Sequence, residues 1–136
     1  MSKIKIYSDG GSRGNPGPSA CAFVVYENDR VIKKDAFFLG KGTNNFAEYT
    51  GIIKALEWLS DSNTCPDTIE YYLDSLLAVS QLNGKFKVKS EDIKPLVQKV
   101  NDLRKALEID VEFIHVRREF NAEADKLLNE KLDENC

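Results

Sequence analysis

Hydrophobic and polar residues alternate at the start of the chain, over residues 4–7. This period of two is typical of a β-strand. Glycine and proline then become frequent, so we expect the strand to end near Asp9 and a turn-rich loop to follow over residues 10–18. A carboxylate at a strand end can face a cleft, and the missing side chains of Gly10 and Gly11 would let a ligand approach the backbone closely.

Further apolar runs predict four more strands. Residues 20–26 form a nearly continuous apolar run, and residues 31–39 form another after a hairpin turn at 27–30. Three consecutive strands with short links indicate an antiparallel meander. Two later runs, at 68–73 and 110–116, predict a fourth and a fifth strand.

Apolar residues recur at spacings of three and four in the remaining segments, which predicts four helices. The first is capped by Thr43-Asn44-Asn45 and ends before a break at 63–67, the second covers 75–82, the third is capped by Ser90, and the fourth is capped by Asn121. The predicted order of elements is β-β-β-α-β-α-α-β-α, which indicates an α/β fold.

The length of 136 residues is typical of one domain, which we take as residues 1–136. A hydrophobic content of 42% suffices for a packed core, and no apolar run is long enough to span a membrane. The polar N-terminus does not resemble a signal peptide. We therefore expect a cytoplasmic protein.

The net charge of −3 argues against a protein that binds nucleic acids indiscriminately. Acids that hold metal ions would count toward this charge, so it does not exclude a polyanionic substrate. Cys21, Cys65 and Cys136 contain no pair at metal-binding spacing, and an odd number suits a reducing compartment. A disulfide between Cys65 and Cys136 is an alternative, because both lie outside the strongly patterned segments.

Four acidic residues stand out. For three of them, a purely structural role is an alternative to a functional one. Asp9 and Asp74 follow predicted strands, although Asp74 can instead cap the next helix. Glu48 falls at the edge of the apolar stripe of its helix, where burial is costly unless the charge is compensated or reaches water. Asp125 lies on the inward side of the first turn of the last helix, where the helix dipole also favours an acid.

Together, the four acids fit one site for hard divalent cations, which prefer oxygen ligands. Carboxylates that crowd together repel one another, and a bound metal gives them a reason to converge. Two cations several ångströms apart can activate a water molecule and stabilise the leaving oxygen of a phosphodiester. The four acids are therefore compatible with metal-dependent hydrolysis of a phosphodiester.

Four motifs follow one another along the chain. They are Tyr7-Ser8-Asp9-Gly10-Gly11-Ser12 with Asn15-Pro16-Gly17, Thr43-Asn44-Asn45 with Ala47-Glu48, Asp74-Ser75 with Gln81 and Gly84, and Asn121 with Ala124-Asp125. With these motifs, the chain resembles ribonuclease H of type 1 over residues 3–132. The resemblance implies a mixed sheet of five strands, three antiparallel ones followed by two parallel additions, flanked by helices. It also implies Mg²⁺- or Mn²⁺-dependent cleavage of the RNA strand of RNA/DNA hybrids, which leaves 3′-hydroxyl and 5′-phosphate ends.

The resemblance also implies roles for single residues. The positions that match the family's metal-binding carboxylates, with two ions bound during catalysis, are Asp9, Glu48, Asp74 and Asp125. The positions that match contacts to the minor groove or the sugars of the hybrid are Gly10, Gly11, Asn15, Asn44, Asn45 and Gln81. Thr43 matches a contact to a DNA phosphate. Ser75 matches a contact to a sugar or phosphate, although capping the next helix explains it equally well.

Two regions depart from the longer members of the family. In place of their basic, tryptophan-rich protrusion, this chain has only Lys85, Lys87 and Lys89, so weaker hybrid binding is expected. These lysines are also typical of a solvated connector. Their loop histidine has no matching loop here, because His115 lies within a predicted strand, where a structural role is more common. We expect Arg118 to assist catalysis instead, through its charge.

The sequence therefore predicts a monomeric ribonuclease H, and it leaves activity on double-stranded RNA open. One alternative is a non-catalytic module on the same fold that binds hybrids or double-stranded RNA; a missing acid would have favoured it. Another alternative is a metal-dependent DNA nuclease or transposase-like domain. That alternative fits the acids but not the signals at Gly10-Gly11 and Asn44-Asn45.

Overall fold

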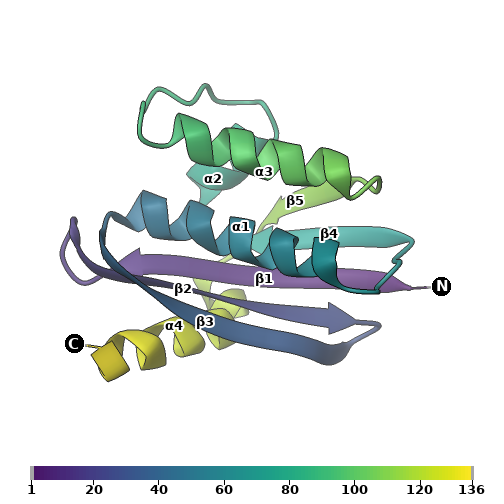
Figure 1. Ribbon diagram of the computed structural model, residues 1–136, viewed down its shortest axis with the longest axis horizontal. Coiled ribbons are helices and arrows are strands. Elements are labelled where there is room, and N and C mark those ends of the chain that lie inside the picture. Colours follow the sequence, from purple (N-terminus) through teal and green to yellow (C-terminus); the bar gives the residue numbers. More distant parts are fainter. Residues whose placement is uncertain (1, 136) are drawn as a thin grey trace.

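A mixed sheet of five strands forms the frame of the computed structural model, which describes residues 2–135 (Figure 1). The strands are β1 (Lys3–Ser12), β2 (Gly17–Glu27), β3 (Arg30–Gly42), β4 (Thr68–Leu73) and β5 (Val111–His115). They lie in the order β3-β2-β1-β4-β5. Pairing is antiparallel within β1, β2 and β3 and parallel where β4 joins β1 and β5 joins β4. This arrangement confirms the predicted sheet.

The helices follow the predicted order, with one added turn. They are α1 (Asn44–Asp61), α2 (Leu76–Leu82), α3 (Lys94–Ala106) and α4 (Ala122–Asn135), and a 3-10 turn, η1 (Arg118–Asn121), precedes α4. The predicted cap at Thr43 is confirmed, because Thr43 Oγ1 accepts a hydrogen bond from the backbone of Phe46 at 3.1 Å. Ser75, for which capping is one of two expected roles, caps α2 by accepting a hydrogen bond from Ala78 at 3.1 Å. Within residues 2–135, no helix has the length and apolar character needed to cross a membrane.

The other two predicted caps are wrong. Ser90 lies in a turn that precedes α3, where its backbone carbonyl accepts hydrogen bonds from the N–H groups of Ile93 and Lys94. Asn121 ends η1 instead of capping α4, and its side chain bonds to a distant strand. A polar residue before an apolar run has the same sequence pattern whether it caps a helix or makes a tertiary contact.

Strand β1 continues past Asp9 to Ser12, so the predicted strand end is wrong. Antiparallel pairing with β2 holds these residues, with Asp9 opposite Ala22 and Ser12 opposite Ser19. Parallel pairing with β4 stops earlier, at Tyr7. Asp9 therefore lies where β1 has lost one of its two neighbouring strands, which opens space for its side chain.

Helices cover the two faces of the sheet unequally (Figure 1). α1, α2 and α3 enclose the main hydrophobic core on one face, which includes Ile52, Leu56 and Tyr71. α4 lies on the other face, over β1, β2 and β3. The buried cluster on the α4 face consists of Ala20, Ala22, Leu128 and Leu132.

The cysteines take no part in a described disulfide. Cys21 is buried, Cys65 is exposed, and both carry free thiols. Cys136, the predicted alternative partner of Cys65, lies outside the described residues, so that pairing stays a prediction.

Candidate active site

Three of the predicted acids converge where β1 extends past β4. Asp9 lies on β1, Glu48 lies near the start of α1, and Asp74 directly follows β4. One carboxylate oxygen from each residue lies within 4.8 Å of those from the other two. Asp9 and Glu48 are only 7% and 6% exposed, and Asp74 is half-buried. The fold thus gathers three acids from two strands and a helix.

Gly10 brings β1 and α1 close enough for this cluster to form. Its backbone N–H points at two of the acids, 2.9 Å from Asp9 Oδ1 and 3.2 Å from Glu48 Oε2. A Cβ atom here would lie 2.2 Å from the carbonyl carbon of Ala47, so any other residue would push α1 away. The close approach expected at Gly10 is therefore made by the helix backbone.

The cluster concentrates negative charge that its surroundings do not neutralise. Burial, together with the charges of Asp74 and Asp125, raises the pKa of Asp9 from its ordinary 3.8 to about 8. Burial and the charge of Asp9 also raise the pKa of Glu48 well above its ordinary value. Within the described chain, Glu48 Oε1 and Asp74 Oδ2 are buried oxygens without a hydrogen-bond partner. Buried acceptors normally have one, so this set of oxygens fits a hard divalent cation.

The geometry excludes two of the purely structural explanations for these acids. Glu48 is too deeply buried to be a boundary residue that reaches water. Ser75, not Asp74, caps α2. Asp125 lies in the first turn of α4, as predicted, and is half-buried. It stands outside the three-acid cluster, but its charge contributes to the raised pKa of Asp9.

Three of the predicted substrate residues are amides whose side-chain oxygens already bind the protein. Asn15 Oδ1 accepts a hydrogen bond from the backbone of Asn44 at 3.0 Å, and Asn44 Oδ1 accepts one from the backbone of Ser12 at 2.9 Å. Gln81 Oε1 accepts one from the hydroxyl of Tyr49. Each amide therefore keeps its NH₂ group, a donor, for other partners.

The remaining predicted contacts surround these amides. Thr43 lines a hollow of about 340 Å³ together with Asn15, Asn44 and Asn45. Gly11 lies on β1, where a Cβ atom would come within 3.8 Å of the side-chain oxygen of Asn44. The glycine and the asparagines thus share one end of the molecule, next to the acids.

A second, larger groove beside Gln81 is positively charged. It has a volume of about 600 Å³ and lies between the start of α1, α2 and the segment before α3. Lys85, Lys87 and Lys89 all line it, together with Asn45. All three lysines are exposed, and within residues 2–135 none of them forms an ion pair. The segment is solvated, as a connector would be, but its charges face a groove.

His115 and Arg118 both lie at the surface. His115 is the last residue of β5 and is paired in register with Leu73, the residue before Asp74. It is exposed, so the expectation that it packs as a structural histidine is wrong. Arg118 opens η1 and is also exposed. In the described part of the chain, no hydrogen bond or ion pair links either residue to the acids.

Sequence reasoning missed two contacts near the site. One is the hydrogen bond from Tyr49 to Gln81, which joins α1 to α2. The other is the hydrogen bond from the side chain of Asn121 to the backbone of Ser8, which joins η1 to β1. Both link residues far apart along the chain, so no local pattern could have revealed them.

Known proteins resemble this chain in sequence and in fold. A family model described as "Reverse transcriptase-like" matches residues 7–131. The solved structure of LC11-RNase H1, isolated from compost, is 38% identical, covers 99% of both chains and has a TM-score of 0.93. LC11-RNase H1 in complex with an RNA/DNA hybrid is 36% identical, with a TM-score of 0.90, and covers 97% of this chain and 98% of that one.

Curated relatives carry related names. Ribonuclease HI of Halobacterium salinarum is 36% identical over 97% of this chain, and ribonuclease H of Clostridium botulinum is 33% identical over 98% of each. The chain spans only 65% of the length of the Halobacterium protein. It spans 36% of a bifunctional protein of Mycobacterium tuberculosis.

Proposed function

The chain belongs to the type 1 ribonuclease H family, and on that premise we propose that it cleaves the RNA strand of RNA/DNA hybrids. The observation that carries this proposal is the cluster of Asp9, Glu48 and Asp74, whose carboxylate oxygens lie within 4.8 Å of one another. The reaction is an in-line hydrolysis of a phosphodiester that leaves 3′-hydroxyl and 5′-phosphate ends.

We propose that these three acids, with Asp125, hold two Mg²⁺ or Mn²⁺ ions during catalysis. The unpaired buried oxygens of Glu48 and Asp74 support this proposal, because both are acceptors that a cation would satisfy. The charges of Asp74 and Asp125, which together with burial raise the pKa of Asp9, support it too, because a bound cation would offset their repulsion. When bound, such ions activate the attacking water and neutralise charge on the leaving oxygen.

The backbone of Gly10 and Gly11 and the nearby amides bind the hybrid in this proposal. Within residues 2–135, the side-chain NH₂ groups of Asn15, Asn44 and Gln81 donate no hydrogen bond, and nucleic-acid minor grooves and sugars present acceptors. Gly11 meets an RNA 2′-hydroxyl through its backbone, which distinguishes RNA from DNA. The remaining contacts proposed are Thr43 to a DNA phosphate, Asn45 to the groove, and Ser75 to a sugar or phosphate in addition to its cap.

Charged side chains outside the acid cluster complete the proposed substrate path. Lys85, Lys87 and Lys89 line a groove that continues from Gln81 and can take a phosphate backbone. Arg118 acts through its charge at the scissile phosphate or at product release. We further propose a monomer, because all four acids come from one chain, and a cytoplasmic location, which suits the free thiols of Cys21 and Cys65.

One assay tests the proposed reaction. Duplexes of a single sequence, made as RNA/DNA hybrid, double-stranded RNA and double-stranded DNA, are incubated with the purified protein in Mg²⁺ or in EDTA. We expect cleavage of the hybrid alone, in Mg²⁺ alone, with ligatable 5′-phosphate ends. The Asp9→Asn variant, purified identically, controls for contaminating nucleases. A second hybrid with 2′-deoxy residues around the scissile bond should resist cleavage there.

Two other outcomes of this assay would replace the proposal, and a third would widen it. Hybrid binding without cleavage would identify a non-catalytic binding module on this fold. Equal cleavage of the DNA duplex would indicate a metal-dependent DNA nuclease. Cleavage of double-stranded RNA beside the hybrid would extend the substrate range without changing the reaction.

A further inference from the structure

Asn121 is a deeply buried amide near the acids for which the proposed reaction gives no role. It is the last residue of η1 and is only 1% exposed. Its Nδ2 donates a hydrogen bond to the backbone carbonyl of Ser8 at 2.8 Å. Ser8 directly precedes Asp9, and Asp125 follows Asn121 by one helical turn. This one hydrogen bond therefore joins the two segments that carry Asp9 and Asp125.

The hydrogen bond forms where the sheet no longer holds β1 on that side. Parallel pairing of β1 with β4 ends with Tyr7 opposite Tyr72, one residue before Ser8. Ser8 is fully buried, and its hydroxyl accepts a separate hydrogen bond from Tyr71 at 2.7 Å. Asn121 thus supplies a partner to the first backbone carbonyl past the last paired residue.

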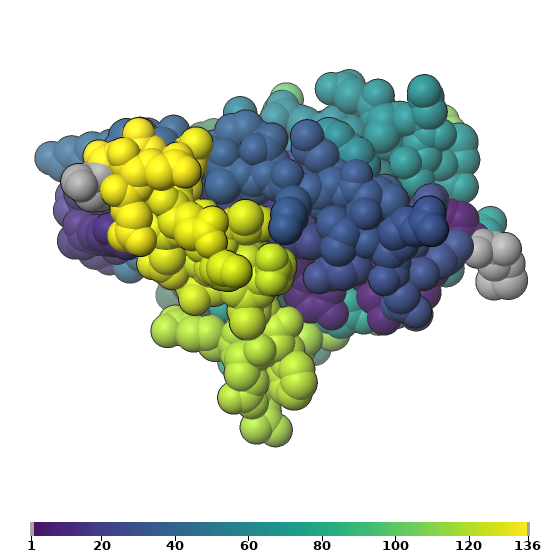
Figure 2. Space-filling model, turned by 90° about the horizontal axis from the view of Figure 1, so that it is seen from below, coloured from purple at the N-terminus to yellow at the C-terminus, as the bar shows by residue number. Residues whose placement is uncertain are grey.

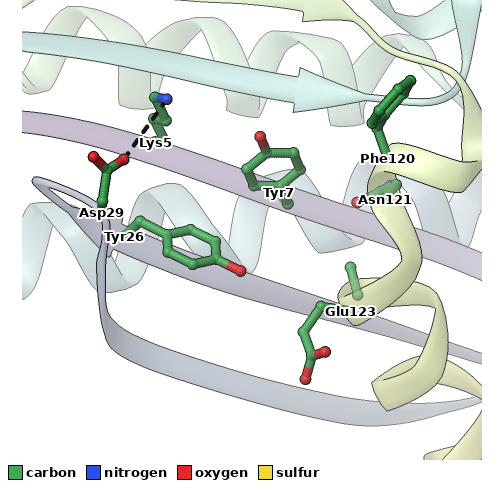
Figure 3. Close-up of a pocket in the computed structure, with 8 residues that line it drawn as sticks. Lys5, Tyr7, Tyr26, Asp29, Phe120, Asn121 and Glu123 are labelled. Atoms are coloured by element: carbon green, nitrogen blue, oxygen red, sulfur yellow. Dashed lines mark ion pairs between the residues drawn. The ribbon is translucent and has the colours of Figure 1, made fainter.

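Packing alone does not fix the start of α4. A hollow of about 250 Å³ lies beside Asn121 on this face of the sheet, lined by Tyr7, Tyr26 and Phe120 (Figure 3). Phe120 is 64% exposed instead of filling the hollow. In the view onto this face, the yellow-green segment that leads into α4 projects beyond the edge of the molecule (Figure 2). The first turn of α4, where Asp125 lies, therefore borders this hollow, and Ala124 is its buried residue.

Side-chain hydrogen bonds tie η1 and α4 to the start of the chain at both ends of α4. Arg13 bonds near the C-terminal end of α4, to Asp133 Oδ1 at 2.6 Å and to the backbone of Asn129 at 3.4 Å. Asn121 makes the other tie, at the end near the acids. Near the acids, Asn121 therefore helps to set the distance from Asp125 to Asp9, whose carboxyl groups also interact directly.

The second polar atom of Asn121 adds nothing to the stability of the described structure. Its Oδ1 is buried without a hydrogen-bond partner. Leaving this acceptor unpaired destabilises the fold, and a leucine of nearly the same shape would avoid that cost but would leave the buried carbonyl of Ser8 unpaired instead. An asparagine at this position is thus explained by the hydrogen bond that its Nδ2 group donates to Ser8.

We propose that Asn121 is a positioning residue that sets Asp125 at its working distance from Asp9. The proposal rests on the proposed function, because it assigns Asp125 to the site that holds the cations. Asn121 itself touches neither substrate nor cation. Its loss should therefore weaken cation binding and slow the reaction while hybrid binding is kept.

The test compares Asn121→Leu with Tyr71→Phe. Asn121→Leu keeps the shape and removes the hydrogen bond to the Ser8 carbonyl. Tyr71→Phe is the matched control, because it removes the other side-chain hydrogen bond to Ser8 without loosening α4. Mn²⁺ affinity is measured from the electron paramagnetic resonance signal of the free ion, without substrate. Thermal unfolding is measured on the same samples, and kcat and KM are measured on one hybrid.

We expect Asn121→Leu to weaken Mn²⁺ binding and lower kcat by about 10- to 100-fold, the scale seen when residues that orient metal ligands are lost. KM for the hybrid should stay within about two-fold, because the substrate contacts are intact. Tyr71→Phe should lower the unfolding temperature and leave Mn²⁺ affinity and kcat unchanged. Asn121→Ala, which adds no bulk, replaces Asn121→Leu if the latter does not fold.

Wild-type Mn²⁺ affinity in a folded Asn121 variant would overturn the proposal. So would equal losses of affinity in Tyr71→Phe, because these would show a general effect of loosening Ser8. If the wild-type protein does not cleave hybrids, the proposed function fails, and the Mn²⁺ measurement still decides the role of Asn121.

Discussion

The two faces of the sheet differ in how firmly their helices are held. Twenty buried residues form the core on the face of α1, and they come from strands and from three helices. The buried cluster on the face of α4 has four residues, two of which are alanines. Beside the start of α4, a hollow of about 250 Å³ takes the place of packed side chains.

The candidate site lies where these two faces meet, past the end of β4. The well-packed face supplies Glu48 from α1, and the sheet supplies Asp9 and Asp74. The thinly packed face supplies Asp125 from α4. Stability and site geometry should therefore respond to different residues. Damage to the core should unfold the protein, whereas damage to the α4 face should first disturb the site.

The largest effect is expected from Asp9→Asn, which removes a carboxylate charge from the site where the two faces meet. Asparagine keeps the shape but not the charge that binds a cation, so hybrid cleavage should be abolished. Gel assays on one hybrid in Mg²⁺ check this expectation. Substantial Mg²⁺-dependent turnover by the purified variant would remove Asp9 from the site.

The same variant should change how stability depends on pH. The pKa of Asp9 is raised in the folded protein to about 8 from its ordinary 3.8. Its favourable contribution is therefore complete below about pH 4 and is lost as the pH rises through about 8. Thermal unfolding in EDTA should show the wild type losing stability over this range and Asp9→Asn losing less. At pH 8 the variant should be the more stable protein; a large drop in its melting temperature would instead give Asp9 a structural role.

A pair of leucines compares the two faces directly. Leu56→Ala, in the main core, should lower the free energy of unfolding by about 3–5 kcal/mol, near the upper end for buried leucines, and leave the turnover of the folded fraction unchanged. Leu128→Ala, under α4, should lower it by about 2 kcal/mol but reduce kcat several-fold. Urea unfolding and steady-state kinetics measure both quantities. The opposite pattern of turnover losses would show that the two faces are not separable in this way.

The last comparison concerns His115 and Arg118, at the end of β5 and the start of η1, where little effect on stability is expected. Arg118→Ala should lower turnover by about ten-fold or more, which corresponds to about 1.4 kcal/mol of transition-state stabilisation. His115→Ala should change turnover less, and its exposure predicts little change in stability as well. Steady-state rates on one hybrid compare the two variants. A large loss with His115→Ala and none with Arg118→Ala would reverse the assignment.

Local patterns were enough to predict the order of strands and helices and the acids that converge. The alternation of apolar residues and the cap at Thr43 depend on neighbours in sequence, and both are confirmed. The true end of β1 was not predictable, because pairing with β2 overrides the turn preference of Gly10 and Gly11.

The role of Asn121 was not predictable for a related reason. Its sequence context is that of a helix cap, and only the folded chain brings it to Ser8. His115 lies in a strand, as expected, but whether a strand residue is covered depends on which helices lie over it. Contacts between distant segments therefore account for the predictions that failed.

The central claim is that Asp9, Glu48 and Asp74 together hold a divalent cation. Crystals grown with Mn²⁺ and measured at the manganese absorption edge test it directly, because anomalous scattering locates the ion itself. The account predicts an anomalous peak bounded by carboxylate oxygens of these three residues. Well-diffracting crystals in saturating Mn²⁺ with no peak there, or with peaks only elsewhere, would contradict it.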